Sequence, residues 1–193
     1  MVGSARLRWR AGALALGAAL AVTTAACSGG DAGDLPPPAS PAAPESAAAT
    51  VEPEHRRILD AYHGAVDAMV AAQRDGDRDH PDLTLYYGDG TPALRDVRFS
   101  IDRHDQRGTY YEGDLEVVTA AVTELELTGD PPIATISACL DDTDYRLVNR
   151  GDGSPVPDTT TGGRYSVTST ALLHEPDDQW YIVETIAHWD EPC

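Results

Sequence analysis

The sequence predicts an α+β domain in which helices come first and antiparallel strands follow. Two amphipathic helical patterns lie within residues 53–104, and after Gly108 the apolar residues recur at every second position. The segments between the β patterns are rich in Gly, Pro and Asp, the residues of tight turns. Helices followed by strands in this order pack as a layer on one face of the sheet.

Residues 1–26 precede this domain and are typical of an export signal. Arg6, Arg8 and Arg10 form a basic region, and an apolar run covers residues 11–26. That run is shorter than the roughly 20 residues needed to span a bilayer. We therefore expect a cleaved signal peptide and not a membrane helix.

The end of the signal resembles a bacterial lipobox, in which a cysteine is lipidated and becomes the new N-terminus. The residues are Thr24-Ala25-Ala26-Cys27, with Thr24 where a lipobox usually has Leu. Lipidation of Cys27 and ordinary cleavage after Ala26 are the alternatives. We expect lipidation, which would hold the protein on the extracytoplasmic face of the cell membrane. Without it, the protein would be secreted.

Cysteine usage supports this choice. The chain has three cysteines, Cys27, Cys139 and Cys193. If Cys27 carries lipid, the other two form an even pair in an oxidising compartment, where disulfides persist. We therefore predict a disulfide between Cys139 and Cys193.

The chain is strongly acidic, with 14 basic and 32 acidic residues and a net charge of −18. Every basic residue is Arg, which together with abundant Ala, Gly and Pro is typical of GC-rich genomes such as those of actinobacteria. Nucleic-acid binding needs clustered cations that replace the counterions of phosphates. The composition therefore excludes nucleic acid as a partner, and it favours a monomer or a weak dimer.

A linker separates the signal from the domain. Residues 27–51 are rich in Pro, Ala and Ser and contain almost nothing that a core could bury. This composition predicts a disordered tether. The pattern changes at Pro53, so we place the domain at residues 52–193, a length within the usual range for one domain.

Two helices are predicted before the strands. The first covers residues 53–75, where Pro53 suits a first turn and Gly76 follows the end. Residues 82–87 predict a short helical turn, and residues 92–104 predict the second helix. The apolar positions at helical spacing are Ile58, Leu59, Tyr62, Val66, Met69 and Val70, then Leu94, Val97 and Ile101.

Five strands with a period of two are predicted after these helices, and a sixth is short. They cover residues 109–113, 115–127, 133–142, 164–175 and 180–189, with the short strand at 145–149. We therefore expect N-terminal helices packed on a curved antiparallel sheet of about five to six strands.

The order of elements and the cysteine positions resemble the nuclear transport factor 2-like, or cystatin-like, superfamily, and in particular secreted actinobacterial lipoproteins with this fold. The segments concerned are AYHGAVDAM, a second helix ending near QRG, a last strand with the pattern W-x-V/I, ACLDDTDY and HWDEPC. The resemblance covers residues 53–193 and implies a curved sheet wrapped around helices as a cone with a pocket. Members of the superfamily include isomerases, dehydratases and non-catalytic binding domains, so the fold alone selects no function.

No metal site or cofactor is expected. Asp75, Asp77 and Asp79 imitate the start of an EF-hand loop, but His80 stands at the position of the required Gly and Tyr86 at that of the bidentate Glu. The two remaining cysteines and the scattered histidines lack the spacing of a zinc site.

Asp142 is the candidate for acid–base chemistry. Side chains alternate along a strand, so the even-numbered residues of 134–142 share one face, which is the more apolar one. We expect this face to meet the helices and any pocket, where a carboxylate can act as a general acid or base. His63, and either Tyr110 or Tyr111, are its candidate companions. The structural alternative, which we prefer, is that Asp142 begins a turn and His63 lies on the polar border of its helix.

The sequence predicts a non-enzymatic envelope module that binds a small apolar ligand or an envelope protein. The alternative is a pocket enzyme of the isomerase or dehydratase type that uses Asp142 as its acid–base group. Trp180, Tyr181 and Trp189 invite a ligand-stacking interpretation, but their strand pattern favours core packing, with Trp189 covering the disulfide.

Overall fold

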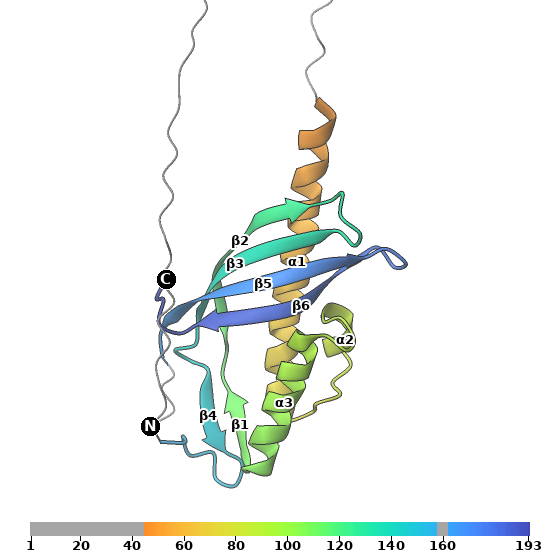
Figure 1. The fold of residues 1–193 in the computed structure, drawn as a ribbon. Helices are drawn as coiled ribbons and strands as arrows, with labels where there is room; N and C mark the ends of the chain where they lie inside the picture. The colour runs from red at the N-terminus through yellow and green to blue at the C-terminus, as the bar shows by residue number, and fades with distance from the viewer. Residues whose placement is uncertain (1–44, 158–161) are drawn as a thin grey trace, which may run out of the picture. The chain divides into compact units, whose positions relative to one another are not determined.

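The computed structural model describes residues 45–157 and 162–193, with side chains from residue 52 onward. The predicted signal peptide, Cys27 and the linker up to residue 44 lie outside these residues. In the described chain the helices precede the strands, so the α+β prediction is confirmed (Figure 1). The elements are α1 Glu45–Asp75, α2 Leu83–Tyr86, α3 Pro92–Gln106, β1 Thr109–Glu112, β2 Glu116–Glu126, β3 Ile133–Asp141, β4 Arg146–Asn149, β5 Arg164–His174 and β6 Gln179–His188.

The first helix begins earlier than the sequence predicted. It starts at Glu45, so it takes in the last residues of the predicted linker, and Pro53 lies inside it rather than in its first turn. The alanines at positions 47–49 account for the difference, because Ala is the strongest helix former. No helix in the described ranges is both long and apolar enough to cross a bilayer.

The six strands of the described residues form two antiparallel sheets, and not the single sheet of about five to six strands that the sequence predicted. The larger sheet has the order β2-β3-β5-β6, and the smaller one pairs β1 with β4. The chain passes from β1 to β2 through Gly113, whose φ is 95°. A Cβ at this position would lie 1.8 Å from the carbonyl oxygen of Asp144, so only glycine fits.

The core lies between the helices and one face of the larger sheet, and Figure 1 shows α1 running across this sheet. Ala134, Ile136 and Ala138 of β3 are buried on that face, as the alternation predicted. Trp180 and Ile182 of β6 are buried beside them. The core-packing prediction is therefore confirmed for Trp180.

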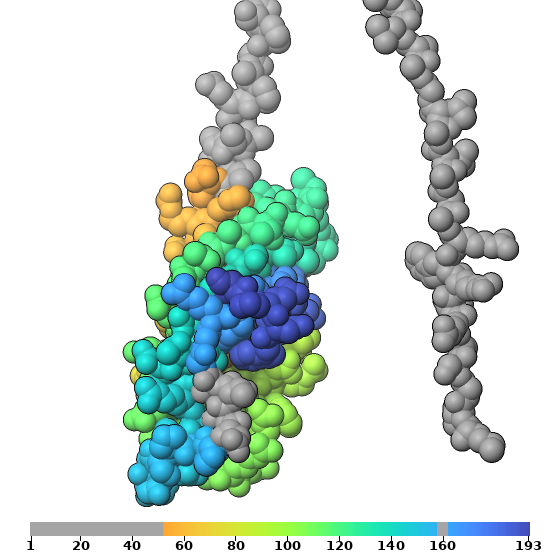
Figure 2. All heavy atoms as spheres, turned by 90° about the vertical axis from the view of Figure 1, so that its left-hand side faces the viewer, coloured from red at the N-terminus to blue at the C-terminus, as the bar shows by residue number. Residues whose placement is uncertain are grey.

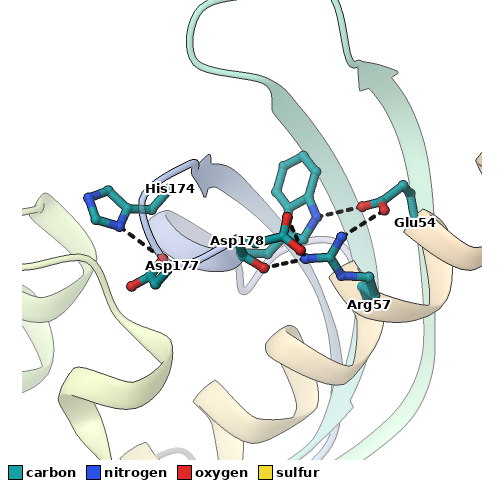
Figure 3. A network of polar contacts seen from close by, with 6 residues as sticks. Glu54, Arg57, His174, Asp177 and Asp178 are labelled. Carbon is teal, nitrogen blue, oxygen red and sulfur yellow. Dashed lines mark hydrogen bonds and ion pairs between the residues drawn. The ribbon is translucent and has the colours of Figure 1, made fainter.

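Polar contacts fasten α1 to the β5–β6 hairpin (Figure 3). The indole Nε1 of Trp180 donates a hydrogen bond to Glu54 Oε2 at 2.9 Å. Arg57 forms ion pairs with Glu54 at 2.8 Å and with Asp178 at 3.1 Å. We call these four residues, Glu54, Arg57, Asp178 and Trp180, the α1–β6 clasp. It gives the buried indole N–H the acceptor that such a group requires.

Candidate functional site

Cys139 of β3 and Cys193 form the predicted disulfide, with their Cα atoms 5.8 Å apart. The same C-terminal segment is bound to β5, because Ser166 N donates to the carbonyl of Glu191 at 3.0 Å. Figure 2 shows these last residues, in dark blue, next to the lighter blue of β5. The prediction of a covalent staple between the central strand and the C-terminus is confirmed.

Asp142 is buried just after β3, and its contacts are structural. Its Oδ1 accepts hydrogen bonds from the backbone N–H groups of Gly162 and Gly163, both at 3.0 Å. Its own carbonyl accepts a hydrogen bond from Tyr145 N at 3.0 Å, which closes a turn. The carboxylate therefore holds the segment that leads into β5.

Of the candidate companions of Asp142, the structure brings neither His63 nor Tyr110 to it. His63 is exposed on α1, with its ring edge-on to Tyr62 at 6.1 Å between centroids. Tyr110 lies under the guanidinium of Arg150, 5.3 Å from its ring centroid. Tyr111, the next residue, points to the opposite side, as strand alternation requires.

Tyr111, the other candidate companion, lies near Asp142 in a largely buried polar cluster whose three other members the sequence had not indicated as site residues. The rings of Tyr111 and Tyr145 stack at 4.7 Å, and His104 of α3 meets Tyr111 edge-on at 4.9 Å. The hydroxyl of Tyr145 donates to the side-chain carbonyl of Gln73 on α1. We call His104, Tyr111, Tyr145 and Gln73 the interior cluster. His104 continues the apolar spacing of Leu94, Val97 and Ile101, a signal by which the sequence could have placed it in the core.

The hydrogen bonds of His104 define its tautomer. Thr109 Oγ1 donates to the carbonyl of His104 at 3.2 Å, so it accepts from His104 Nδ1, also at 3.2 Å. His104 Nε2 is then a bare acceptor, buried with no hydrogen-bond partner among the described residues. Burial lowers the pKa of His104, and the nearby Arg103 and Arg107 lower it further. The folded structure therefore favours the neutral form of His104.

Burial also raises the pKa values of the tyrosines around Asp142. Desolvation is the main cause for Tyr111 and Tyr165, and the negative charge of Asp142 adds to it in both cases. Desolvation alone raises the pKa of Tyr62 to about 12, and its buried hydroxyl has no partner in the part of the chain that the structure describes. These hydroxyls stay protonated at physiological pH and can serve as donors, not as bases.

Within the described ranges, no three His, Cys, Asp or Glu side chains gather closely enough to hold a metal ion. The acidic residues of the EF-hand-like stretch have other partners. Asp77 accepts a hydrogen bond from Asp79 N at 3.0 Å, and Asp79 pairs with Arg98 at 3.4 Å. Asp141, next to Asp142, is bound by Thr143 and by Arg164, which lower its pKa to about 2.

A groove with a volume of about 410 Å³ opens beside β6, and we call it the β6 groove. Its apolar lining comes from the α2–α3 segment, the β2–β3 turn and the β5–β6 hairpin. The apolar lining residues are Tyr87, Pro131, Leu172, Leu173, Tyr181 and Val183. Ligand sites commonly have volumes of about 300–1,000 Å³ and a mostly apolar lining, so this groove is of suitable size and character.

The groove lies on the face of the sheet that points away from the core. Ala171 and Ile182 are paired and fully buried on the core face. Their neighbours Leu172 and Tyr181, which are also paired, must point to the other face. Tyr87 forms a parallel bridge with Ile182 and thereby sets the α2–α3 segment along the edge of β6 as a wall.

A polar group stands at one side of this groove. His174 Nδ1 lies 2.9 Å from Asp177 Oδ1 (Figure 3), and the hydroxyl of Tyr181 donates to Asp177 Oδ2 at 2.9 Å. The hydrogen bond with His174 is the main reason that the pKa of Asp177 is lowered. The core-packing prediction was thus wrong for Tyr181. It was also wrong for Trp189, which is 68% exposed and lies over Tyr165 at 4.1 Å.

No family model matches the chain, and no curated protein matches it. Among solved structures, the chain is similar to the crystal structure of the intermembrane space region of the chloroplast protein ARC6. The sequence identity is 11%, and the match covers 69% of this chain and 95% of that one with a TM-score of 0.46. A likeness at this level carries no argument about function.

Proposed function

We propose that this is an exported, lipid-anchored protein of the cell envelope whose domain binds a small apolar ligand without catalysing a reaction. The proposal that the domain binds an apolar ligand rests on the β6 groove, with its volume of about 410 Å³ and its apolar lining. The export signal, lipidation of Cys27 and anchoring at the membrane rest on residues 1–27 of the sequence.

The nuclear transport factor 2-like cone is the finer part of the fold proposal. The order of the helices and strands supports it, as do the buried face of β3 and the helices that cover this face. In a cone of this kind the ligand pocket would be expected among the residues facing the helices. Here Tyr62, Tyr111, Tyr145 and Tyr165 bring their rings into that space. We therefore place the ligand in the β6 groove and not inside the cone.

The alternative is a pocket enzyme of the isomerase or dehydratase type that uses Asp142 as a general acid or base. We rank it second because Asp142 Oδ1 already accepts two backbone hydrogen bonds. A base must be within hydrogen-bond reach of the proton that it removes, and this oxygen faces the chain itself.

Assembly with an envelope protein, or with a second copy, is a further candidate supported by the outward face of the sheet. A cross-strand row of uncharged residues follows this face: Ala121, Ser137, Thr168 and Ile186. Ile186 is 49% exposed, and Ile133 on the same face is 40% exposed. If this surface mediates association, Ile186→Arg should reduce the mass observed by light scattering to that of a monomer.

The binding proposal is tested with the neutral fluorescent probe N-phenyl-1-naphthylamine. We expect saturable fluorescence enhancement with the exported domain, and its loss in Val183→Trp, because the indole would fill the groove. Ile186→Trp is the matched control, since it places the same ring on the same strand away from the groove lining. Absence of saturable binding, or equal binding by both variants, would contradict the proposal.

A further inference from the structure

We infer that the ligand of the β6 groove is an amphipathic monocarboxylate whose charged end lies in a neighbouring cavity lined by arginines. This inference rests on the proposed binding function and names the chemical class of the ligand. It starts from the second cavity of the described chain, which has a volume of about 380 Å³. We call it the arginine cavity, after Arg78, Arg95 and Arg98 in its lining.

The two cavities adjoin each other at one segment of the chain. Asp89 lines both of them, with Gly88 on the side of the groove and Gly90 on the side of the arginine cavity. Two of the three residues in this ridge have no side chain, and Gly90 has open space where a Cβ would be. An elongated ligand can therefore pass over the ridge from one cavity into the other.

The charge of the arginine cavity favours a single negative charge on the ligand. Its three arginines face two carboxylates, Asp89 and Asp102, so the lining has a net charge of about +1. This excess of positive charge is notable in a chain with 14 basic and 32 acidic residues. A doubly charged phosphate would leave unbalanced negative charge beside Asp89, so a carboxylate is the better match.

The three arginines differ in whether they are available. Arg78 binds Asp102 at 2.6 Å. Arg98 binds Asp79 at 3.4 Å and donates to the carbonyl of Arg78 at 3.2 Å. The backbone N–H of Arg95 donates to the carbonyl of Thr91 at 3.1 Å, but its guanidinium makes no hydrogen bond or ion pair with another described residue, so it is free to bind a carboxylate in a bidentate manner.

The surroundings of Arg95 also favour the binding of a carboxylate. Arg95 lies in the first turn of α3, a helix of 15 residues, whose N-terminal end carries partial positive charge. Leu94 and Phe99 line the same cavity, and Phe99 is 64% exposed. The ligand would thus have apolar contacts at the ridge as well as in the groove. Its carboxylate would meet Arg95, and its alkyl or aryl body would lie on Leu172, Tyr181 and Val183.

The test compares decanoate with decanol as competitors of N-phenyl-1-naphthylamine at pH 7. The two share an alkyl chain and differ in charge. We expect decanoate to displace the probe at about tenfold lower concentration, or about 1.4 kcal/mol in binding free energy, because only its carboxylate can form a charge-assisted hydrogen bond with Arg95. Arg95→Gln should remove this preference and leave the affinity for decanol unchanged.

Two further variants keep the test decisive. Arg56→Gln removes an exposed arginine of α1 that lines neither cavity, so it should retain the preference for decanoate. Asp89→Asn should strengthen decanoate binding more than decanol binding, because it removes a negative charge from the ridge. Both variants and Arg95→Gln are first compared with the native domain by thermal unfolding.

The outcomes separate this inference from the proposed function. If decanol competes and decanoate is no better, the inference is overturned and the apolar groove stands. If decanoate is better but Arg95→Gln and Asp89→Asn change nothing, the carboxylate binds elsewhere and the inference is also overturned. If neither compound displaces the probe, or the probe itself does not bind, the proposed function fails together with the inference.

Discussion

Two regions of the molecule each combine a histidine, an aspartate and tyrosine, but with opposite consequences. In the interior, His104 packs on Tyr111, and the charge of Asp142 acts on that tyrosine. Beside the β6 groove, Asp177 binds both His174 and Tyr181. The residue types are the same, so they do not distinguish a structural cluster from a binding site.

Burial and available partners make the difference. In the interior, Asp142 is 7% exposed and binds two backbone N–H groups, so its negative charge serves to hold a loop. At the groove, the side chain of Asp177 is 45% exposed and that of His174 is 57% exposed. The side chains of both residues therefore remain partly exposed, and His174 lies among the apolar residues of the groove lining. A polar side chain is available to a ligand only where its hydrogen-bonding atoms are not already occupied by contacts that stabilise the fold.

The largest expected effect is the loss of stability when the disulfide between Cys139 and Cys193 is removed. Replacing Cys139 and Cys193 together by Ser should lower the free energy of unfolding by about 4 kcal/mol, because a loop of this length loses much entropy when it is closed. Urea unfolding, followed by tryptophan fluorescence, measures the change. The native domain in reducing agent is the control and should unfold like the double variant. A loss below about 1 kcal/mol would show that the other contacts of the C-terminal segment suffice.

The next effect compares the two aspartates directly. Asp142→Ala should cost about 3 kcal/mol, since it leaves the N–H groups of Gly162 and Gly163 without their charged acceptor. Asp142→Asn, which keeps an acceptor oxygen, should cost less. Asp177→Ala is the matched variant at the groove and should change stability by no more than about 0.5 kcal/mol. Equal costs for the two alanine variants would remove the distinction between the regions.

A smaller effect appears in the pH dependence of stability. The pKa of His104 is lower in the folded chain than the value of about 6.5 expected in the unfolded chain. The unfolded state therefore binds a proton more readily, and this contribution to stability is complete above about pH 6.5 and is lost as the pH falls toward the folded pKa. Melting temperatures between pH 7.5 and 5 measure the decline.

A variant of His104 tests this assignment. His104→Gln should flatten the profile below about pH 6.5, because Gln does not titrate in this range. An unchanged slope in His104→Gln would show that the pH dependence arises elsewhere in the domain.

Periodicity was sufficient to predict most of the fold. The predicted strand at residues 133–142 is observed as Ile133–Asp141, and the predicted helix at 92–104 as Pro92–Gln106. These signals are local, because alternation and helical spacing follow from the geometry of the chain itself. The start of α1 was missed because proline is favoured in a first helical turn and disfavoured inside a helix, whereas here Pro53 lies inside α1.

The functional regions depend on contacts between distant segments. Asp142 could be placed on the buried face of β3, but its partners Gly162 and Gly163 lie 20 and 21 residues further along the chain. The β6 groove was not predictable, because its wall depends on the pairing of Tyr87 with Ile182. No period in the sequence indicates that these two residues meet. The burial of His104, by contrast, could have been predicted, because this residue continues the helical spacing of Val97 and Ile101.

The α1–β6 clasp has a mechanical consequence. Trp180 and Glu54 are 126 residues apart in sequence, yet one hydrogen bond joins them. Tension that enters the domain along α1 from its N-terminal side reaches Glu54 and Arg57 first and passes directly to Asp178 and Trp180. The larger sheet therefore bears part of the force before α1 can separate from the core. The residues of α1 that precede Glu54 lie outside this junction and would yield first.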